Sequence, residues 1–399
     1  MYLIESHTIT KSNPLWKECD RICFASKNLY NRSLYLLKQE LETNGKMISF
    51  NDMYHLIKNE DCFKTLPNDV SKYTLMQLNR DFMSYFKAIK SWKKNPKKFK
   101  SCPKLPNFKP KDLGRCLVGF TKNVCRLKNN QILFNKHIDL KINTKVDNVV
   151  EVQIVPQKSC YKIQVCYLKQ EKKLINNTNY MSIDLGLNNL ATCVTTEFKS
   201  FIVNGKPLKA INHFYNQKLA KEQSQLKKNH NKYSSNKTQK LTLKRNNKVI
   251  NYLHKCSKEI IKNAVDNNIS TIVIGKNKEW KQNINIGSKN NQNFVQIPFN
   301  TLIFQIEYKA KLQGISVLQH EESYTSKCSA LDLEPVKKHD FYLGKRVKRG
   351  LFKSSNNTII NADSNGAINI LRKQFGEVFT LDQIQGFVVN PIKINLNKN

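Results

Sequence analysis

Residues 180–196, YMSIDLGLNNLATCVTT, constrain the fold of this chain more than any other stretch. A short apolar run leads into Asp184, a turn follows through Gly186 and Asn188, and a second β-prone run leaves it. This pattern predicts a tight hairpin of two buried strands. Asp184 stands where the first strand ends, and a carboxylate there is costly to desolvate unless it binds a cation or a hydrogen-bond donor. Asp184 is therefore either a cap of the hairpin turn or a ligand.

Positive charge dominates the composition. The 399 residues include 67 lysines and arginines against 30 aspartates and glutamates, a formal net charge of +37. Small soluble domains carry a net charge of about 2–8, so solubility alone does not account for this excess. With 40% hydrophobic residues, the chain can form two or three domains with cores of their own. The composition predicts a folded protein that binds a polyanion, with nucleic acid the default.

Signals for membranes, secretion and disulfides are not evident in the sequence. No run approaches the roughly 18 consecutive apolar residues of a membrane span. The first residues, MYLIESHTITKSNPLW, lack a basic region followed by an apolar one. The eleven cysteines are scattered, odd in number and never arranged as CxxC, which argues against a disulfide framework and a zinc knuckle. We expect a cytoplasmic, nucleoid-associated protein without zinc or a membrane partner; the sequence leaves its oligomeric state open.

The first hundred residues are predicted to be mainly helical. After one strand within residues 2–10, apolar residues recur at helical spacing from Leu15 to about Trp92. Lys27, Asn28 and Tyr30 form a polar and aromatic cluster on the first of these helices. The cluster is either the solvent-exposed face of an amphipathic helix or a nucleic-acid contact. We take its members as candidate nucleic-acid-binding residues.

Residues 90–111, KSWKKNPKKFKSCPKLPNFKPK, differ in kind from the helices before them. Lysines alternate with aromatic residues and with four prolines, at positions 96, 103, 106 and 110. Proline disfavours both helix and strand, so we expect an extended cationic strap whose aromatic rings can stack on bases. The candidate nucleic-acid-binding residues of this strap are Trp92, Lys93, Lys94, Lys97, Lys98 and Lys109.

The order of the remaining elements predicts the fold class. Short alternating runs between residues 116 and 168 predict an all-β module of the size of a small barrel. From residue 180 onward we expect three strands, two long basic helices, a strand at residues 269–274, a helix, a strand, a polar insertion and a last helix. This is the order of an RNase H-like α/β fold. Active carboxylates in that fold lie on the first strand, near the end of the fourth and on the last helix.

A second carboxylate stretch, INADSNGAINIL, occupies residues 360–371. Asp363 opens the last predicted helix, where it can cap free N–H groups, bind a metal, or do both. Small residues around it, among them Gly366, allow close packing on a sheet. Two-metal phosphodiesterases hold two divalent ions about 3.5–4 Å apart between carboxylates of separate elements, and hard oxygen ligands suit Mg²⁺ or Mn²⁺. Asp184 and Asp363 supply two such ligands, and we expect a third from the region between them.

Three motifs carry a resemblance to a known family. They are DLGLNNLAT at residues 184–192, YTSKCS at 324–329 and ADSNGAINI at 362–370, and KNLYN at 27–31 together with the strap agrees. The chain resembles TnpB, the OrfB-family proteins of bacterial and archaeal insertion sequences, which are relatives of the type V CRISPR effectors. The resemblance implies a RuvC-type nuclease that an RNA guides to DNA beside a short transposon-adjacent motif. It implies as partners a guide RNA encoded by the transposon end and target double-stranded DNA, with Mg²⁺ or Mn²⁺ as cofactor.

The resemblance also implies a domain layout. Residues 1–14 would be the first strand of the β-module, 15–100 a helical recognition domain, and 101–172 a barrel-like wedge module. Residues 178–399 would form the RuvC domain, with an insertion at about 323–359 in place of the family's zinc knuckle. Only Cys328 of that knuckle remains, and residues 345–352 replace the second cysteine pair. Lys345, Arg346 and Arg349 in this segment are candidate nucleic-acid-binding residues.

The chain departs from the family at the third carboxylate. The family usually has a Glu at the end of the strand predicted at residues 269–274, where this chain has Gly275. Glu321 or Glu322, at the end of the neighbouring strand, can replace it, but adjacent strand residues point to opposite faces, so only one can serve. Glu279 is a weaker candidate because it lies several residues past its strand. The predicted catalytic residues are Asp184, Glu321 or Glu322, and Asp363, with Asp184, Glu322 and Asp363 as the metal ligands.

We therefore predict an RNA-guided, metal-dependent DNA endonuclease of an insertion sequence. If neither Glu serves, the alternative is an RNA-guided DNA-binding repressor that does not cut. A nuclease without a guide fits less well, because the large basic surface suits a guide and its heteroduplex. A transposase of the HUH type is excluded, because no two of the eight histidines are two residues apart.

Overall fold

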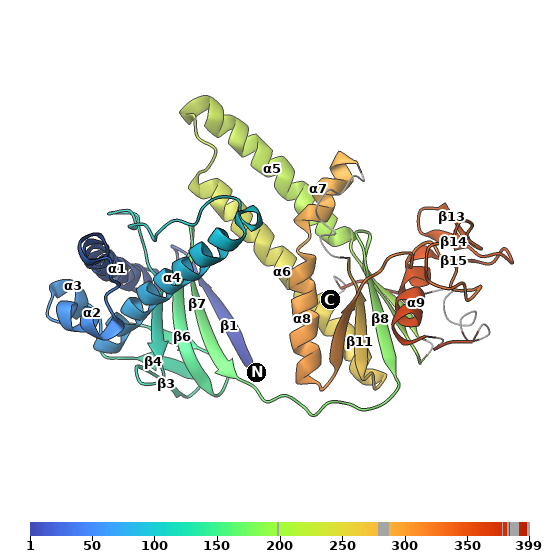
Figure 1. The fold of residues 1–399 in the computed structure, drawn as a ribbon, viewed down its shortest axis with the longest axis horizontal. Coiled ribbons are helices and arrows are strands. Elements are labelled where there is room, and N and C mark those ends of the chain that lie inside the picture. Colours follow the sequence, from blue (N-terminus) through green and yellow to red (C-terminus); the bar gives the residue numbers. More distant parts are fainter. Residues whose placement is uncertain (198, 278–286, 377, 381–382, 384–390, 397–399) are drawn as a thin grey trace. The chain divides into compact units, whose positions relative to one another are not determined.

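The computed structural model describes residues 1–197, 199–277, 287–376, 378–380, 383 and 391–396. It divides into two compact units, Met1–Lys169 and Gln170–Asn399 (Figure 1). None of the described helices combines the length and the apolar character that crossing a membrane requires.

The strands of the first unit form two antiparallel sheets that share one hydrophobic core. The larger sheet has the order β1-β7-β6-β2, with β1 Tyr2–Ile9, β7 Tyr161–Leu168, β6 Val149–Pro156 and β2 Val118–Thr121. The smaller sheet has the order β3-β4-β5, with β3 Cys125–Lys128, β4 Gln131–Phe134 and β5 Lys141–Asn143. The first strand of the chain thus joins strands more than a hundred residues away, with Tyr2 opposite Leu168.

The sequence predicted a small barrel for this module, and the structure has these two sheets instead. No hydrogen-bonded ladder between the described strands joins β1 to β2 and closes the larger sheet. The physical reason is that the helical segment supplies part of the core. Ile22 and Val70, from two helices, pack in one cluster with Val152 of β6 and Ile132 of β4, so the sheet buries its face without curling onto itself.

Helices fill the region where apolar periodicity predicted them. They are α1 Trp16–Asn44, α2 Phe50–Ile57, α3 Asp61–Lys64 and α4 Asn68–Lys94, followed by a short 3₁₀ turn, Pro96–Lys98. The strap predicted to be extended from residue 90 therefore begins later, because α4 continues to Lys94 and the first proline stands at position 96. Proline lacks the N–H that a helix interior needs, so the helix ends just before it.

The sheet of the second unit has the strand order β12-β11-β8-β9-β10-β16. Strands β8, β9 and β10 form an antiparallel meander, β11 runs parallel to β8, and β12 runs parallel to β11. Five of these strands have the RNase H-like arrangement, which confirms the fold class predicted for this half of the chain. Strand β16, parallel to β10, was not predicted. The bounds are β8 Tyr180–Leu185, β9 Asn189–Thr195, β10 Ser200–Asn204, β11 Thr271–Gly275, β12 Ser316–His320 and β16 Ile392–Ile394.

Helices cover both faces of this sheet (Figure 1). One face packs against α5 Lys206–His230, α6 Asn236–Asp266 and α8 Phe299–Leu312, and a further helix, α7 Ser288–Gln296, precedes α8. The opposite face packs against α9 Ala362–Phe375, together with the small insertion sheet β13 Lys345–Lys348, β14 Leu351–Lys353 and β15 Ile359–Asn361. Because both faces are covered, β9 reads as a continuous buried run rather than an alternating one.

Candidate active site

Asp184 and Asp363 reach the same site from a strand and from a helix. Asp184 is the fifth residue of β8 and pairs with Thr192 of β9. Asp363 is in the first turn of α9, whose N-cap is Asn361. The Asn361 side chain accepts hydrogen bonds from the backbone N–H groups of Asp363 and Ser364. The capping role that the sequence left open for Asp363 therefore belongs to Asn361, and the Asp363 carboxylate is available for another role.

The carboxylate of Asp184 lies directly against the start of α9. A Cβ atom placed on Gly366 would be 2.9 Å from Oδ2 of Asp184, which is closer than any side chain tolerates. Gly366 is fully enclosed within α9, so it brings the helix backbone close to the end of β8. The small residue that the sequence placed here thus keeps room for the carboxylate.

Glu322 occupies the space that Gly275 leaves empty at the end of β11. A Cβ atom on Gly275 would be 2.8 Å from Oε2 of Glu322. Asn277, just beyond β11, accepts a hydrogen bond from the Glu322 backbone N–H and donates one to its Oε1, at 3.1 and 3.4 Å. The carboxylate of Glu322 therefore lies beside the strand end where the resemblance leads one to expect a Glu, although it comes from the end of the neighbouring strand.

Glu321 points elsewhere. Its carboxylate forms an ion pair with Lys373 of α9 at 2.8 Å, and 54% of its side chain is exposed. This hydrogen bond to the lysine lowers the pKa of Glu321. Of the two glutamates that the sequence could not separate, the structure places Glu322 at the site and Glu321 on the surface. Glu279, the weaker candidate, lies outside the described residues.

The electrostatics of the site favour a bound cation. Burial, the charge of Asp363 and then that of Glu322 together raise the pKa of Asp184 well above its usual range. Burial, followed by the charge of Glu321, raises the pKa of Glu322 to about 6. Among the described residues, the Asp184 side chain has no hydrogen-bond or ion-pair partner. Burial and neighbouring carboxylates thus disfavour the ionised forms of Asp184 and Glu322, and a divalent cation would relieve that cost.

The donor set at this site suits Mg²⁺ or Mn²⁺. Carboxylate oxygens are hard ligands, which suit these ions. Within the described ranges, no three His, Cys, Asp or Glu side chains lie close enough together to surround one ion. Asp184 lies close enough to both of the other carboxylates for their charges to raise its pKa, so the three side chains offer hard oxygen donors to divalent cations.

Two further side chains contact Asp363. Asn189, at the start of β9, donates from Nδ2 to Oδ2 of Asp363 at 2.7 Å. Arg346, on β13, brings its guanidinium to 3.6 Å from Oδ1, and its charge lowers the pKa of Asp184. The sequence placed Arg346 among nucleic-acid-binding residues but did not assign a role to Asn189. The sequence feature that points to Asn189 is its position beside Asn188, in the turn expected to close the hairpin.

The insertion at residues 323–359 is held together by polar side chains. Glu334 is 2% exposed, and its two carboxylate oxygens accept the backbone N–H groups of Ser329 and Leu343. Cys328, the remaining cysteine of the motif, is buried and donates to the carbonyl of Lys337. From α9, Asn365 and Asn369 donate to the carbonyl of Cys328. The buried amides of the motif at 362–370 thus fix this loop onto the helix.

The candidate nucleic-acid-binding residues divide into two groups. Lys27 is 2% exposed and donates to the carbonyl of Lys111, and Tyr30 is 3% exposed and donates to Asp81. Both are buried, which corrects their assignment as nucleic-acid contacts. Trp92 is half-buried. The remaining candidates are exposed: Asn28, Lys93, Lys94, Lys97, Lys98, Lys109, Lys345, Arg346 and Arg349.

The strap is fixed to α1 through backbone bonds. Asn31 donates to the carbonyl of Lys109 and accepts from its N–H, both at 2.9 Å. The ammonium of Lys109 lies 5.4 Å from the centroid of the Tyr30 ring, and that of Lys38 lies 4.8 Å from the ring of Phe108. The residues of the KNLYN motif therefore position the strap and leave most of its lysines exposed.

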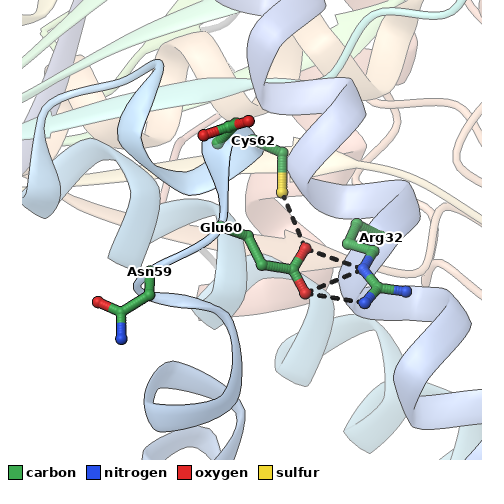
Figure 2. A pocket seen from close by; sticks show the side chains of 5 residues that line it. Arg32, Asn59, Glu60 and Cys62 are labelled. Carbon is green, nitrogen blue, oxygen red and sulfur yellow. Dashed lines mark hydrogen bonds and ion pairs between the residues drawn. The ribbon is translucent and has the colours of Figure 1, made fainter.

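A surface pocket beside α1 has no chemistry of its own. Figure 2 shows the guanidinium of Arg32 paired with both carboxylate oxygens of Glu60, and the thiol of Cys62 donating to the same carboxylate. Burial raises the pKa of Cys62 to about 11, so its thiol stays protonated at neutral pH. These charges neutralise each other, so we place no site here.

Comparisons with known proteins agree with these features. A family model described as "Probable transposase" matches residues 162–281, and one described as "Cas12f1-like, TNB domain" matches residues 299–370. TnpB-like protein ORF457 of Acidianus two-tailed virus is 27% identical over 206 residues, covering 49% of this chain and 42% of that protein. TnpB-like protein MJ0751 of Methanocaldococcus jannaschii is 32% identical over 166 residues, covering 39% and 58%. Over these regions the chain is similar to TnpB-like proteins.

A CRISPR-associated relative and a solved structure extend the comparison. The endodeoxyribonuclease Cas12f2 of a Micrarchaeota archaeon is 27% identical over 234 residues, covering 53% of the chain and 40% of that protein. The matched regions thus span about 40–58% of the length of these curated relatives. The fold is similar to that of Cas12f1 in its complex with single-guide RNA and target DNA, with a TM-score of 0.53 at 16% identity, over 89% of this chain and 83% of that one.

Proposed function

We propose that this protein is a TnpB-family RNA-guided DNA endonuclease whose third active-site carboxylate is Glu322. The observation that carries the proposal is the position of the Glu322 carboxylate, whose Oε2 lies 2.8 Å from where a Cβ atom of Gly275 would be and whose charge raises the pKa of Asp184. Asp184, Glu322 and Asp363 then form a carboxylate set drawn from two strand ends and one helix. A protein that only bound DNA would have no use for such a set.

The three carboxylates and the residues around them would have different roles in hydrolysis. Asp184, Glu322 and Asp363 would hold two Mg²⁺ or Mn²⁺ ions, which activate water and stabilise the leaving oxygen in phosphodiester hydrolysis. Asn189 fixes the orientation of the Asp363 carboxylate through its hydrogen bond. Arg346, exposed and near Asp363, can move its guanidinium to a phosphate of the DNA strand, where a planar fork of donors binds well.

The guide and target would be bound through their backbones. The exposed lysines of the strap and the cations of the insertion sheet can neutralise phosphates, and the exposed Phe108 can stack on a base. We assign the helical part of the first unit to recognition and its β-module to a wedge-like role. The target would be double-stranded DNA beside a short transposon-adjacent motif, and the guide would be encoded at the transposon end. Cas12f1, the similar fold, is itself described in complex with a guide RNA and target DNA.

The test is reconstitution with RNA. The protein is copurified with RNA transcribed beside its gene, and the complex is incubated with a plasmid that carries the matching target and Mg²⁺. We expect wild type to cut and Asp184→Ala to bind the target without cutting. Binding without cutting by the wild type would favour the repressor instead, and failure to retain RNA would contradict both functions.

A further inference from the structure

The turn that carries Glu322 is not part of any strand or helix. β12 ends at His320, and Glu322 is two residues beyond it. Asp184, by contrast, is held within the β8–β9 ladder, and Asp363 within the first turn of α9. A carboxylate on an irregular turn needs other contacts to stay within about 0.5 Å of a productive position.

Three hydrogen bonds from one side chain of α9 fix this turn. The ammonium of Lys373 donates to the carbonyl of Glu321 at 3.0 Å, to the carbonyl of Ser323 at 3.1 Å and to the Glu321 carboxylate at 2.8 Å. A lysine ammonium has three N–H donors, and all three are used. The two carbonyls belong to the residues immediately before and after Glu322. Lys373 thus forms hydrogen bonds to the backbone on both sides of Glu322, the residue that we assign to the metal site.

Other hydrogen bonds also support the turn, but none of them is made to the two carbonyls that Lys373 binds. Thr325 donates from its hydroxyl to the carbonyl of Glu322 at 2.8 Å, and Asn369 of α9 holds the carbonyl of Thr325. On the other side Asn277 contacts Glu322 itself. Lys373 is only 21% exposed, so a lost ammonium would leave two carbonyls with no donor in its place.

We propose that Lys373 is a positioning residue that sets the Glu322 carboxylate in the metal site by holding the carbonyls of Glu321 and Ser323. This role rests on the function proposed above. It also gives Glu321 a purpose, since its carboxylate anchors the same ammonium. In metal sites, loss of a residue that orients a ligand typically costs about 10–100-fold in metal affinity or activity.

The test is a double-mutant cycle between Lys373→Met and Glu322→Gln, read by Mn²⁺ binding calorimetry on the full chain and by the Mg²⁺ dependence of target cutting. Lys338→Met, at an exposed lysine of the insertion, is the control. We expect Lys373→Met to weaken Mn²⁺ binding and to raise the Mg²⁺ needed for half-maximal cutting by about tenfold or more. In the Glu322→Gln background it should have no further effect, because the two residues act as one unit.

Each outcome of this experiment supports or contradicts the positioning role of Lys373. If Lys373→Met matches Lys338→Met while the wild type binds Mn²⁺ and cuts, the role of Lys373 is overturned and the proposed function stands. If its effect adds fully to that of Glu322→Gln, Lys373 does not act through Glu322. If the wild type neither binds Mn²⁺ nor cuts, the proposed function falls and this role falls with it. Thermal melting checks folding, and Lys373→Gln, which keeps two N–H donors, is used if Lys373→Met does not fold.

Discussion

Single residues decide which carboxylates meet in this protein. Asn361 takes the capping role at α9 and frees Asp363, Gly366 lets α9 approach Asp184, and Gly275 leaves space for Glu322. The active site therefore depends as much on missing side chains as on those that are present. Positions of this kind are sensitive to a single added carbon, because protein interiors have few voids to absorb it.

Gly275→Ala tests this sensitivity. Its Cβ would lie 2.5 Å from Cδ1 of Ile370 and 2.8 Å from Oε2 of Glu322, so one of the two must move. We expect target cutting to fall about 10–100-fold, as for other changes that misplace a metal ligand, with guide RNA binding unchanged. The measurement is the rate of plasmid cutting by the guide-bound complex. A variant that cuts at the wild-type rate would show that the Glu322 carboxylate does not need this space.

Lys309 gives a prediction on pH that does not involve the active site. Burial lowers its pKa to about 8, and its ammonium donates to Ser257 and to the carbonyl of His254. The unfolded chain then holds this proton up to about pH 10.4 while the folded chain loses it from about pH 8, so Lys309 adds stability as pH rises through that window.

The comparison is between wild type and Lys309→Met, by urea unfolding at pH 7 and pH 9.5 under reducing conditions. Because Lys309 is partly exposed, we expect the stability of wild type relative to the variant to rise by only about 1 kcal/mol between these pH values. Cysteines away from Lys309 ionise alike in both chains, and burial raises the pKa of the neighbouring Cys256 so that its thiol stays protonated at both pH values. An unchanged difference would show that the lysine has its ordinary pKa in the folded protein.

At the residue scale the sequence alone predicts two of the three carboxylates of the proposed site without an alternative. Asp184 and Asp363 could be found because each lies beside small and apolar residues in a motif of its own. The choice between Glu321 and Glu322 could not be made, because it depends on Lys373, fifty residues away in sequence. The burial of Lys27 was missed for a similar reason, since its partner carbonyl belongs to the strap.

Among the segments of the first unit, the strap is held to α1 by side-chain hydrogen bonds to its backbone. Asn31 supplies two of them, to the N–H and the carbonyl of Lys109. We expect Asn31→Ala to loosen the backbone of the strap, whose lysines are already exposed, so that limited trypsin digestion cuts between residues 97 and 111 several-fold faster. Asn44→Ala, at the exposed end of the same helix, is the control. Equal cutting in both variants would show that the strap is fixed by other contacts.

The elements themselves were largely predictable, and the exceptions have physical causes. Long periodic segments such as α1 and α4, and the hairpin β8–β9, follow directly from where their apolar residues recur. The open sheet in place of a barrel could not be foreseen, because helices distant in sequence supply its core. Strands β13–β15 and β16 are short and mostly exposed, so they leave little alternation in the sequence.

Charge is the property that acts at the scale of the whole molecule. The helices α5 and α6 form a basic hairpin, and between residues 213 and 248 only Thr238 is buried (Figure 1). This segment has ten lysines and arginines against one glutamate. A folded helical hairpin with few buried residues and mostly positive charge is able to bind a polyanion. We therefore expect this hairpin to contribute to guide RNA binding.

Replacing four lysines of α5 with glutamine tests this contribution. Each phosphate contact adds about 0.7–0.9 to the slope of log affinity against log salt, so losing four should lower that slope by about 3. The measurement is guide RNA affinity between 50 and 200 mM salt, and Lys338→Gln is the control. An unchanged slope would place the RNA elsewhere on the protein. The four residues, all exposed, are Lys218, Lys221, Lys227 and Lys228.

The central claim is that Glu322, and not Glu321, completes the site with Asp184 and Asp363. The most direct measurement is the rate of target cutting by the guide-bound complex at saturating Mg²⁺, for Glu322→Gln beside Glu321→Gln. We expect Glu322→Gln to cut at least about 100-fold more slowly than wild type, because a ligand matters more than the residues that orient it. Glu321→Gln should retain cutting within a few-fold of wild type. The reverse result, or full activity in Glu322→Gln, would contradict the account.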